Sequence, residues 1–66
     1  MSILDWMLKI GERGFGTYLR YDPLREEKKW TIGWYDGRWC DTDDPERAME
    51  SLHDFIEKRE DNARTD

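Results

Sequence analysis

The chain has 66 residues, one cysteine and a net charge of −5, so it is long enough for only one small domain. Cys40 alone cannot form a disulfide within the monomer, and Cys40 and the single His53 are too few for a structural zinc site. No apolar run is long enough to span a membrane, and the first residues lack the pattern of a secretion signal. We therefore expect a cytoplasmic protein whose four tryptophans, three tyrosines and two phenylalanines build most of the core.

The segment 2–11 is predicted to form a short helix. Ser2 is a suitable N-cap, and Asp5 stands three residues later, where an acidic side chain completes a capping box. Either Gly11 or Gly14 can end the helix by adopting a left-handed conformation.

The apolar arc of this helix is wider than one core-facing stripe requires. The residues that widen it are Leu4, Trp6 and Leu8. Exposed apolar strips of this kind usually mark an interface, so an alternative hypothesis is a homodimer that associates through this helix with a structural or regulatory role.

Alternating apolar and polar residues then predict three antiparallel strands. The first ends at Pro23 and is followed by a polar connector. A two-residue hairpin turn at Asp36-Gly37 is predicted to join the other two. The strand ranges are 14–22, 29–35 and 38–42.

The turn also predicts the strand register. With Asp36 and Gly37 as its central residues, Tyr35 would face Arg38 and Trp34 would face Trp39, and directly paired residues point to the same side of a sheet. The core face would then carry Trp30, Ile32, Trp34 and Trp39. The opposite face would carry Thr31, Gly33, Tyr35, Arg38 and Cys40.

The segment 43–60 is predicted to form a second helix. Asp44 as N-cap and Pro45 at the first helical position suit a helix start. One face carries the apolar residues Ala48, Met49, Leu52, Phe55 and Ile56. The predicted fold class is therefore α+β, with the order α-β-β-β-α, a three-stranded antiparallel meander and two helices packed on one face. We expect one domain over residues 1–61 and a frayed tail over residues 62–66.

This order of elements resembles that of the double-stranded-RNA-binding domain. That family holds phosphates with lysines at the start of its second helix, where this chain has "TDDPER" at residues 42–47. Carboxylates there would repel a phosphate backbone, so direct nucleic-acid binding is not expected. The strand–Asp-Gly–strand–helix stretch also resembles a β-β-α unit of small bacterial and phage proteins, including HicB-like antitoxins, and this resemblance assigns no residue roles.

The sequence offers little chemistry for catalysis or for cofactors. Cys40 and His53 could pair as nucleophile and base, but their places in a strand and at the border of an apolar stripe favour structural roles. The acids at positions 41, 43, 44 and 46 lack the spacing of a calcium loop, and Pro45 commits the segment to a helix start. We therefore predict no enzymatic activity, no metal site and no cofactor.

Acidic residues are concentrated in the last third of the chain. Residues 41–66 contain ten Asp and Glu against four Lys and Arg, whereas residues 1–40 contain six against seven. The outer face of the second helix would carry Glu46, Glu50, Asp54, Glu57 and Asp61. We predict a non-enzymatic interaction module, an accessory or inhibitor protein of the phage or mobile-element kind. It would mask a basic surface of a partner protein, such as a nucleic-acid-binding protein.

Two further surfaces are candidates for binding. Tyr18, Tyr35 and Arg38 could form a second contact on the outer sheet face, because Tyr and Arg are favoured in binding hot spots. A third hypothesis is an aromatic ligand-binding module, which would require Trp30, Trp34 or Trp39 to be exposed. The predicted register favours a core role for these tryptophans.

Overall fold

A computed structural model of the protein describes residues 1–35 and 37–64, without the side chains of residues 62–64. Asp36, one of the two predicted turn residues, lies outside the described residues. The elements are α1 (Ile3–Glu12), β1 (Thr17–Tyr21), β2 (Trp30–Trp34), β3 (Gly37–Thr42) and α2 (Pro45–Arg64). The strands form one antiparallel sheet in the order β1-β2-β3. The predicted α+β class and the α-β-β-β-α order are confirmed.

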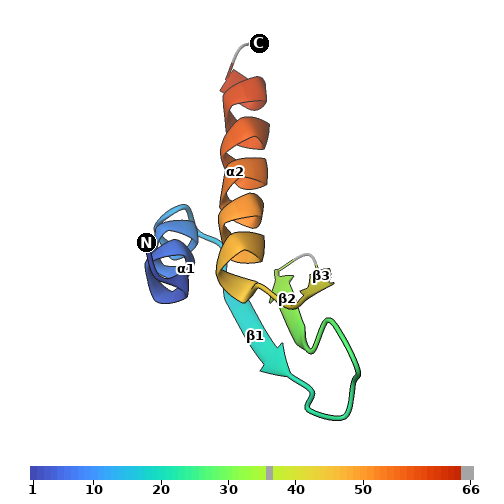
Figure 1. Ribbon diagram of the computed structural model, residues 1–66. Coiled ribbons are helices and arrows are strands. Elements are labelled where there is room, and N and C mark those ends of the chain that lie inside the picture. The colour runs from blue at the N-terminus through green and yellow to red at the C-terminus, as the bar shows by residue number, and fades with distance from the viewer. Residues whose placement is uncertain (36, 65–66) are drawn as a thin grey trace.

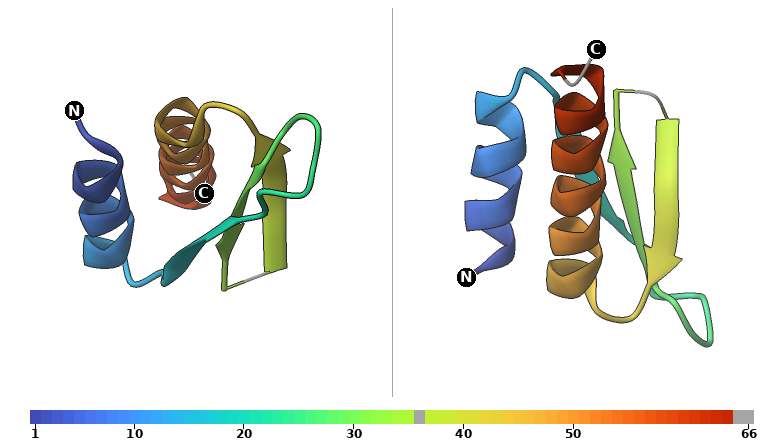
Figure 2. Two further views of the ribbon diagram at one scale, coloured as in Figure 1. Left: turned by 60° about the horizontal axis from the view of Figure 1, so that its bottom comes forward. Right: turned by 90° about the horizontal axis from the view of Figure 1, so that it is seen from above.

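Both helices lie on the same side of the sheet, as predicted, but they contact it differently. Figures 1 and 2 show α2 between α1 and the strands. The main neighbour of α1 is α2, and α1 also contacts β1, whereas α2 contacts β2 and β3 directly. The sheet is therefore covered mainly by α2, and α1 forms an outer layer on that helix.

The start of α1 has the predicted capping box. The Asp5 backbone N–H donates to Ser2 Oγ at 3.3 Å, and the Ser2 backbone N–H donates to Asp5 Oδ2 at 3.0 Å. The hydrogen bonds from Ser2 lower the pKa of Asp5. After the last turn, Gly14 has a φ of +93°, which only glycine adopts without strain.

The core lies where the two helices meet β2. Its buried members are Ile10 of α1, Ile32 and Trp34 of β2, and Ala48, Met49, Leu52 and Ile56 of α2. Trp39 packs against this cluster, with its ring centroid 6.4 Å from that of Trp34 in an edge-to-face arrangement. The prediction that these two tryptophans belong to the core is confirmed.

Trp30 differs from the other sheet tryptophans. It is half-buried, and its ring centroid lies 4.6 Å from that of Tyr21 on the paired strand. It is not among the described residues that pack on the core cluster, in which Ile32 and Trp34 are the members from β2. The predicted core role therefore does not extend to Trp30, which continues the aromatic surface of the sheet beyond the core cluster.

The hairpin between β2 and β3 does not have the predicted register. Trp34 pairs with Gly37 and not with Trp39, and Tyr35 lies in the turn and not opposite Arg38. Gly37 has a φ of +114°, a conformation that favours glycine. The glycine is thus the first residue of β3, and strand pairing begins at it.

A β-bulge in β3 changes the face to which the side chains after Arg38 point. Gly33 pairs with Arg38, but Ile32 pairs with Cys40, so Trp39 is the extra residue of the bulged strand. Trp39 and Cys40 both pack against the core. The predicted position of Cys40 on the outer face is therefore wrong, because the bulge adds a residue that strict alternation does not include.

The start of α2 matches its prediction. Asp44 accepts a hydrogen bond through Oδ1 from the Arg47 backbone N–H at 3.2 Å, as an N-cap does, and Pro45 is the first helical residue. The helix continues to Arg64, three residues into the segment predicted as a tail, and residues 65–66 lie outside the described part. No helix in the described part of the chain has the length and apolar character needed to cross a membrane.

Candidate interaction surface

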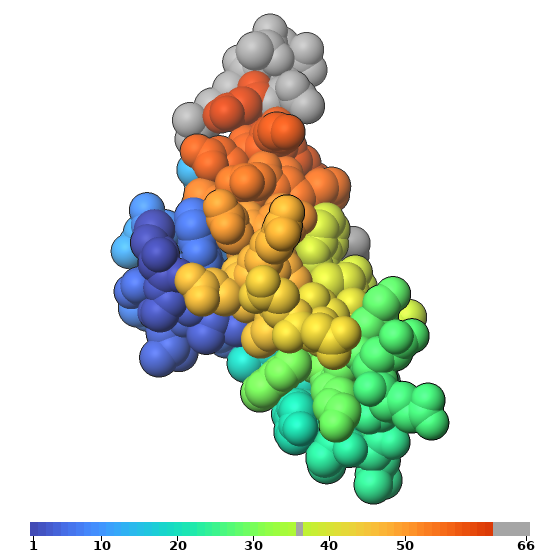
Figure 3. Space-filling model, in the orientation of Figure 1, coloured from blue at the N-terminus to red at the C-terminus, as the bar shows by residue number. Residues whose placement is uncertain are grey.

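Acidic residues form a stripe along α2. We call Glu46, Glu50, Asp54, Glu57 and Asp61 the acidic stripe. They recur every three or four residues, so they share one side of the helix. All are exposed except Glu57, which is half-buried. Figure 3 shows α2 uncovered along one side between α1 and the strands.

The members of the stripe differ in their contacts. Among the side chains that the structure describes, Glu46, Glu50 and Asp61 form no ion pair, so their charges face solvent. Glu57 instead holds Arg13, the C-cap of α1, with 3.5 Å between Arg13 Nη2 and Glu57 Oε1. Arg13 also pairs with Glu60. Glu57 thus helps to join the helices, whereas the first half of the stripe has no such structural contact.

His53 lies beside the stripe and faces inward. It is only 9% exposed, and its ring centroid is 5.1 Å from that of Trp6. Its Nδ1 atom is buried and has no hydrogen-bond partner. The nearest acidic oxygens are Asp54 Oδ1 at 3.5 Å and Glu57 Oε2 at 3.7 Å. This group is not among the predicted sites, although a histidine four residues before a glutamate on a helix could have indicated it.

The three residues predicted as a second contact surface do not all lie together. Tyr18 and Arg38 both pair with Gly33 on the outer face of the sheet, and both are exposed. Tyr35 is exposed too, but its ring stacks on Phe15 with a centroid distance of 4.9 Å. A binding role for these three residues stays a prediction. Tyr35 lies in the turn, with its ring on Phe15, which packs against the core, and its predicted place opposite Arg38 is wrong. The shifted hairpin register is the cause.

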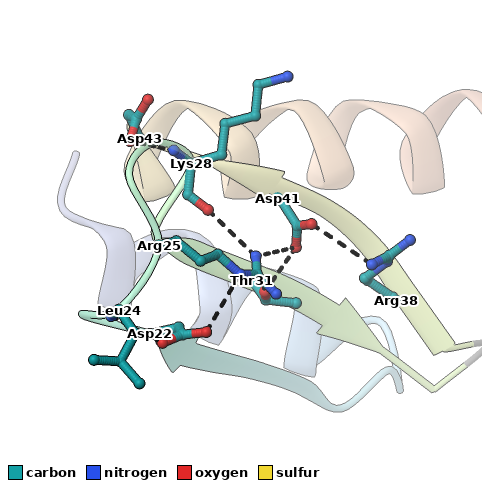
Figure 4. A network of polar contacts seen from close by, with 8 residues as sticks. All are labelled: Asp22, Leu24, Arg25, Lys28, Thr31, Arg38, Asp41 and Asp43. Atoms are coloured by element: carbon teal, nitrogen blue, oxygen red, sulfur yellow. Dashed lines mark hydrogen bonds and ion pairs between the residues drawn. The ribbon is translucent and has the colours of Figure 1, made fainter.

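Sequence analysis also missed a polar network on the outer face of the sheet (Figure 4). Beyond the bulge, Asp41 pairs with Thr31, whose hydroxyl donates to Asp41 Oδ1 at 2.7 Å. Arg25 Nη1 lies 3.2 Å from Asp41 Oδ1, and Arg38 Nη1 lies 3.5 Å from Asp41 Oδ2. The hydrogen bond from Thr31, with the contacts of the two arginines, lowers the pKa of Asp41. The carboxylate is thereby committed to holding the sheet together.

The same network fixes the connector between β1 and β2. Arg25 Nε lies 3.4 Å from Asp22 Oδ2, and the Lys28 backbone N–H donates to Asp43 Oδ1 at 2.7 Å. Lys28 has a φ of 52°. Of the basic residues of the connector, Arg25 is therefore paired with acids of the chain, at Asp22 and Asp41.

The residues predicted to form a dimer interface separate into two groups. Leu4 and Leu8 are each 66% exposed, whereas Trp6 is half-buried and packs against the core cluster. The exposed apolar surface of α1 is therefore narrower than predicted, because it includes Leu4 and Leu8 but little of Trp6. Homodimerisation through this helix stays a prediction.

Cys40, considered for catalysis, and the sheet tryptophans, considered for ligand stacking, lie mainly in or beside the core. Burial, and after it the charge of Asp41, raises the pKa of the Cys40 thiol, which disfavours the nucleophilic thiolate. Trp34 is 7% exposed and Trp39 packs on the core. Trp30 is half-buried and is not among the described residues that pack on the core cluster, and its neighbour Tyr21 is exposed.

Comparison with protein-family models gives no match, and neither curated proteins nor solved structures show significant similarity to this chain. A functional hypothesis must therefore come from the residues themselves.

Proposed function

We propose that the protein is a non-enzymatic interaction module that binds and masks a basic surface of a partner protein through the acidic stripe of α2. The observation that carries this proposal is the exposure of Glu46, Glu50, Asp54 and Asp61 on one side of a helix that is uncovered there. A row of like charges attracts a surface of opposite charge and accelerates its association.

The way the helix is held supports a role for this side. The opposite side of α2 packs in the core through Leu52 and Ile56. Arg13, at the end of α1, forms ion pairs with Glu57 and Glu60 in the C-terminal half of α2. The acids are thus displayed on a helix that is already fixed in place. A rigid helix loses little conformational freedom when it binds. A nucleic-acid-binding protein is a suitable partner, because its phosphate-binding surface is basic. An accessory or inhibitor role of the phage or mobile-element kind, in the cytoplasm, is consistent with such masking.

The test is a charge reversal in the half of the stripe without structural contacts. The variant Glu46→Lys/Glu50→Lys should keep its fold, because both side chains are exposed and unpaired among the described residues. The assay is capture of partner proteins from an extract of the native host at low salt. We expect this variant to lose the proteins that the wild type captures. The expected loss is at least about tenfold in affinity, since like charges across an interface are strongly unfavourable.

A matched control separates the position of the charges from their number. The variant Glu26→Lys/Glu27→Lys makes the same change in net charge on the exposed connector between β1 and β2. It should capture the same proteins as the wild type. If the stripe variant captures them equally well, or if the two variants lose them to the same extent, the stripe is not the binding surface.

A further inference from the structure

We propose that His53, Asp54 and Glu57 form a binding site for a divalent transition-metal cation, with Zn²⁺ as the representative ion. The site lies on the side of α2 next to α1. It does not depend on the protein partner proposed above, because it requires no second chain.

The buried histidine nitrogen is the main observation. His53 Nδ1 is shielded from solvent and has no hydrogen-bond partner, and an unpaired buried polar atom is costly. It faces two carboxylate oxygens at 3.5 and 3.7 Å, which is longer than an ordinary hydrogen bond. The three ligand atoms lie within 4.8 Å of one another.

These separations suit the ligands of one ion. With metal–ligand bonds of about 2.0–2.1 Å in a tetrahedral site, two ligand atoms are about 3.4 Å apart. The two nitrogen–oxygen distances are close to this value, so small side-chain movements would complete the geometry. One imidazole nitrogen and two carboxylate oxygens are ligands that Zn²⁺ accepts, with water in the remaining position.

Arg13 does not occupy the oxygen that the site needs. It contacts Glu57 through Oε1, whereas Glu57 Oε2 faces His53. Arg13 is also paired with Glu60, which offsets its positive charge near a cation. The side chains of Asp54 and Glu57 are about half exposed, which gives an ion access from solvent.

Calorimetric titration of the intact protein with Zn²⁺ tests the proposal. We expect saturable binding of one ion per chain and an increase in the melting temperature with Zn²⁺, because a ligand of the native state stabilises it. Glu57→Gln and Asp54→Asn should each weaken Zn²⁺ binding at least about tenfold, since even outer contacts of a metal site have effects of this size. His53→Gln should abolish the binding.

Two control variants make the result specific. Glu50→Gln removes an exposed acid of the same helix outside the cluster, and Cys40→Ser removes the other strong Zn²⁺ ligand. Both should bind Zn²⁺ as the wild type does. The proposal is overturned if the wild type shows no saturable binding, or if Glu57→Gln and Asp54→Asn bind Zn²⁺ unchanged. A loss of binding in Cys40→Ser alone would assign the ion to the thiol and would likewise overturn the site.

Discussion

Replacement of Gly33 by alanine should change stability in opposite directions depending on the residue at position 18. A Cβ atom at position 33 would lie 1.9 Å from Tyr18 Cζ, so the tyrosine ring must move for the methyl group to fit. Gly33 is buried although it lies on the outer face of the sheet, because the ring of Tyr18, itself 43% exposed, covers it. Its φ is not in the left-handed region, so alanine can adopt the backbone conformation.

The magnitude follows from two opposing effects. Alanine in a strand is favoured over glycine by about 0.5–1 kcal/mol because the unfolded chain has less freedom to lose. Against this, displacement of the ring removes a cross-strand contact of about 0.2–1 kcal/mol and adds about 1–3 kcal/mol of overpacking. We expect Gly33→Ala to destabilise the wild type by about 2 kcal/mol when the middle values of these effects are combined.

The Tyr18→Ala background removes the ring that would clash with the new methyl group. In that background, Gly33→Ala should stabilise the protein by about 0.5–1 kcal/mol. Urea unfolding followed by tryptophan fluorescence measures the stability of the four proteins of this double-mutant cycle: the wild type, the two single variants and the double variant. The m-values should be unchanged. Equal effects of Gly33→Ala in the two backgrounds would show that the Tyr18 ring does not cover Gly33.

Three other substitutions test the core and the polar network. Ile10→Ala should lower the free energy of unfolding by about 2–5 kcal/mol, because this side chain of α1 is fully buried. Leu8→Ala, on the exposed side of the same helix, should change it by no more than about 0.5 kcal/mol. Similar urea midpoints for the two variants would contradict the placement of α1. The lowered pKa of Asp41 means that its contribution to stability is present above the unfolded pKa of about 3.9 and is lost as the pH falls through the folded value. The difference in urea midpoint between wild type and Asp41→Asn should therefore be constant near neutral pH and shrink below about pH 4, and a difference that persists in acid would argue against the network.

The helices and the residues at which they begin are largely encoded in local sequence. Ser2 and Asp5 reproduce a capping box, and Asp44 with Pro45 defines the start of α2, because these signals depend on residues only a few positions apart. Alternation was equally informative for β1, which forms a strand as predicted, with Leu19 paired to Ile32 and packed against the core.

The β2–β3 hairpin could not be predicted in the same way. The rule for two-residue turns places Asp36 and Gly37 together at the centre, but the pairing of Gly37 with Trp34 shifts the register. The bulge at Trp39 then compensates for the shift. A bulge depends on how bulky side chains pack under the sheet, and a single sequence does not show that packing.

The candidate site was predictable only in part. The acidic stripe follows from helical periodicity, and its first members are exposed as expected. The group around His53 depends on the packing of α1 on α2, which brings Trp6 onto the imidazole ring and Arg13 onto Glu57. These contacts join residues far apart in the chain, so the spacing of His53 and Glu57 on α2 could indicate the pair but not the burial of the imidazole ring.

The most direct test of the proposed function is the salt dependence of binding to the captured partner. The affinities of the wild type, Glu46→Lys/Glu50→Lys and Glu26→Lys/Glu27→Lys would be measured as ionic strength rises. The account predicts that the wild type and the connector variant bind tightly at low salt and weaken as salt screens the charges, while the stripe variant binds weakly throughout. Equal affinity and equal salt dependence for the stripe variant and the wild type would contradict it.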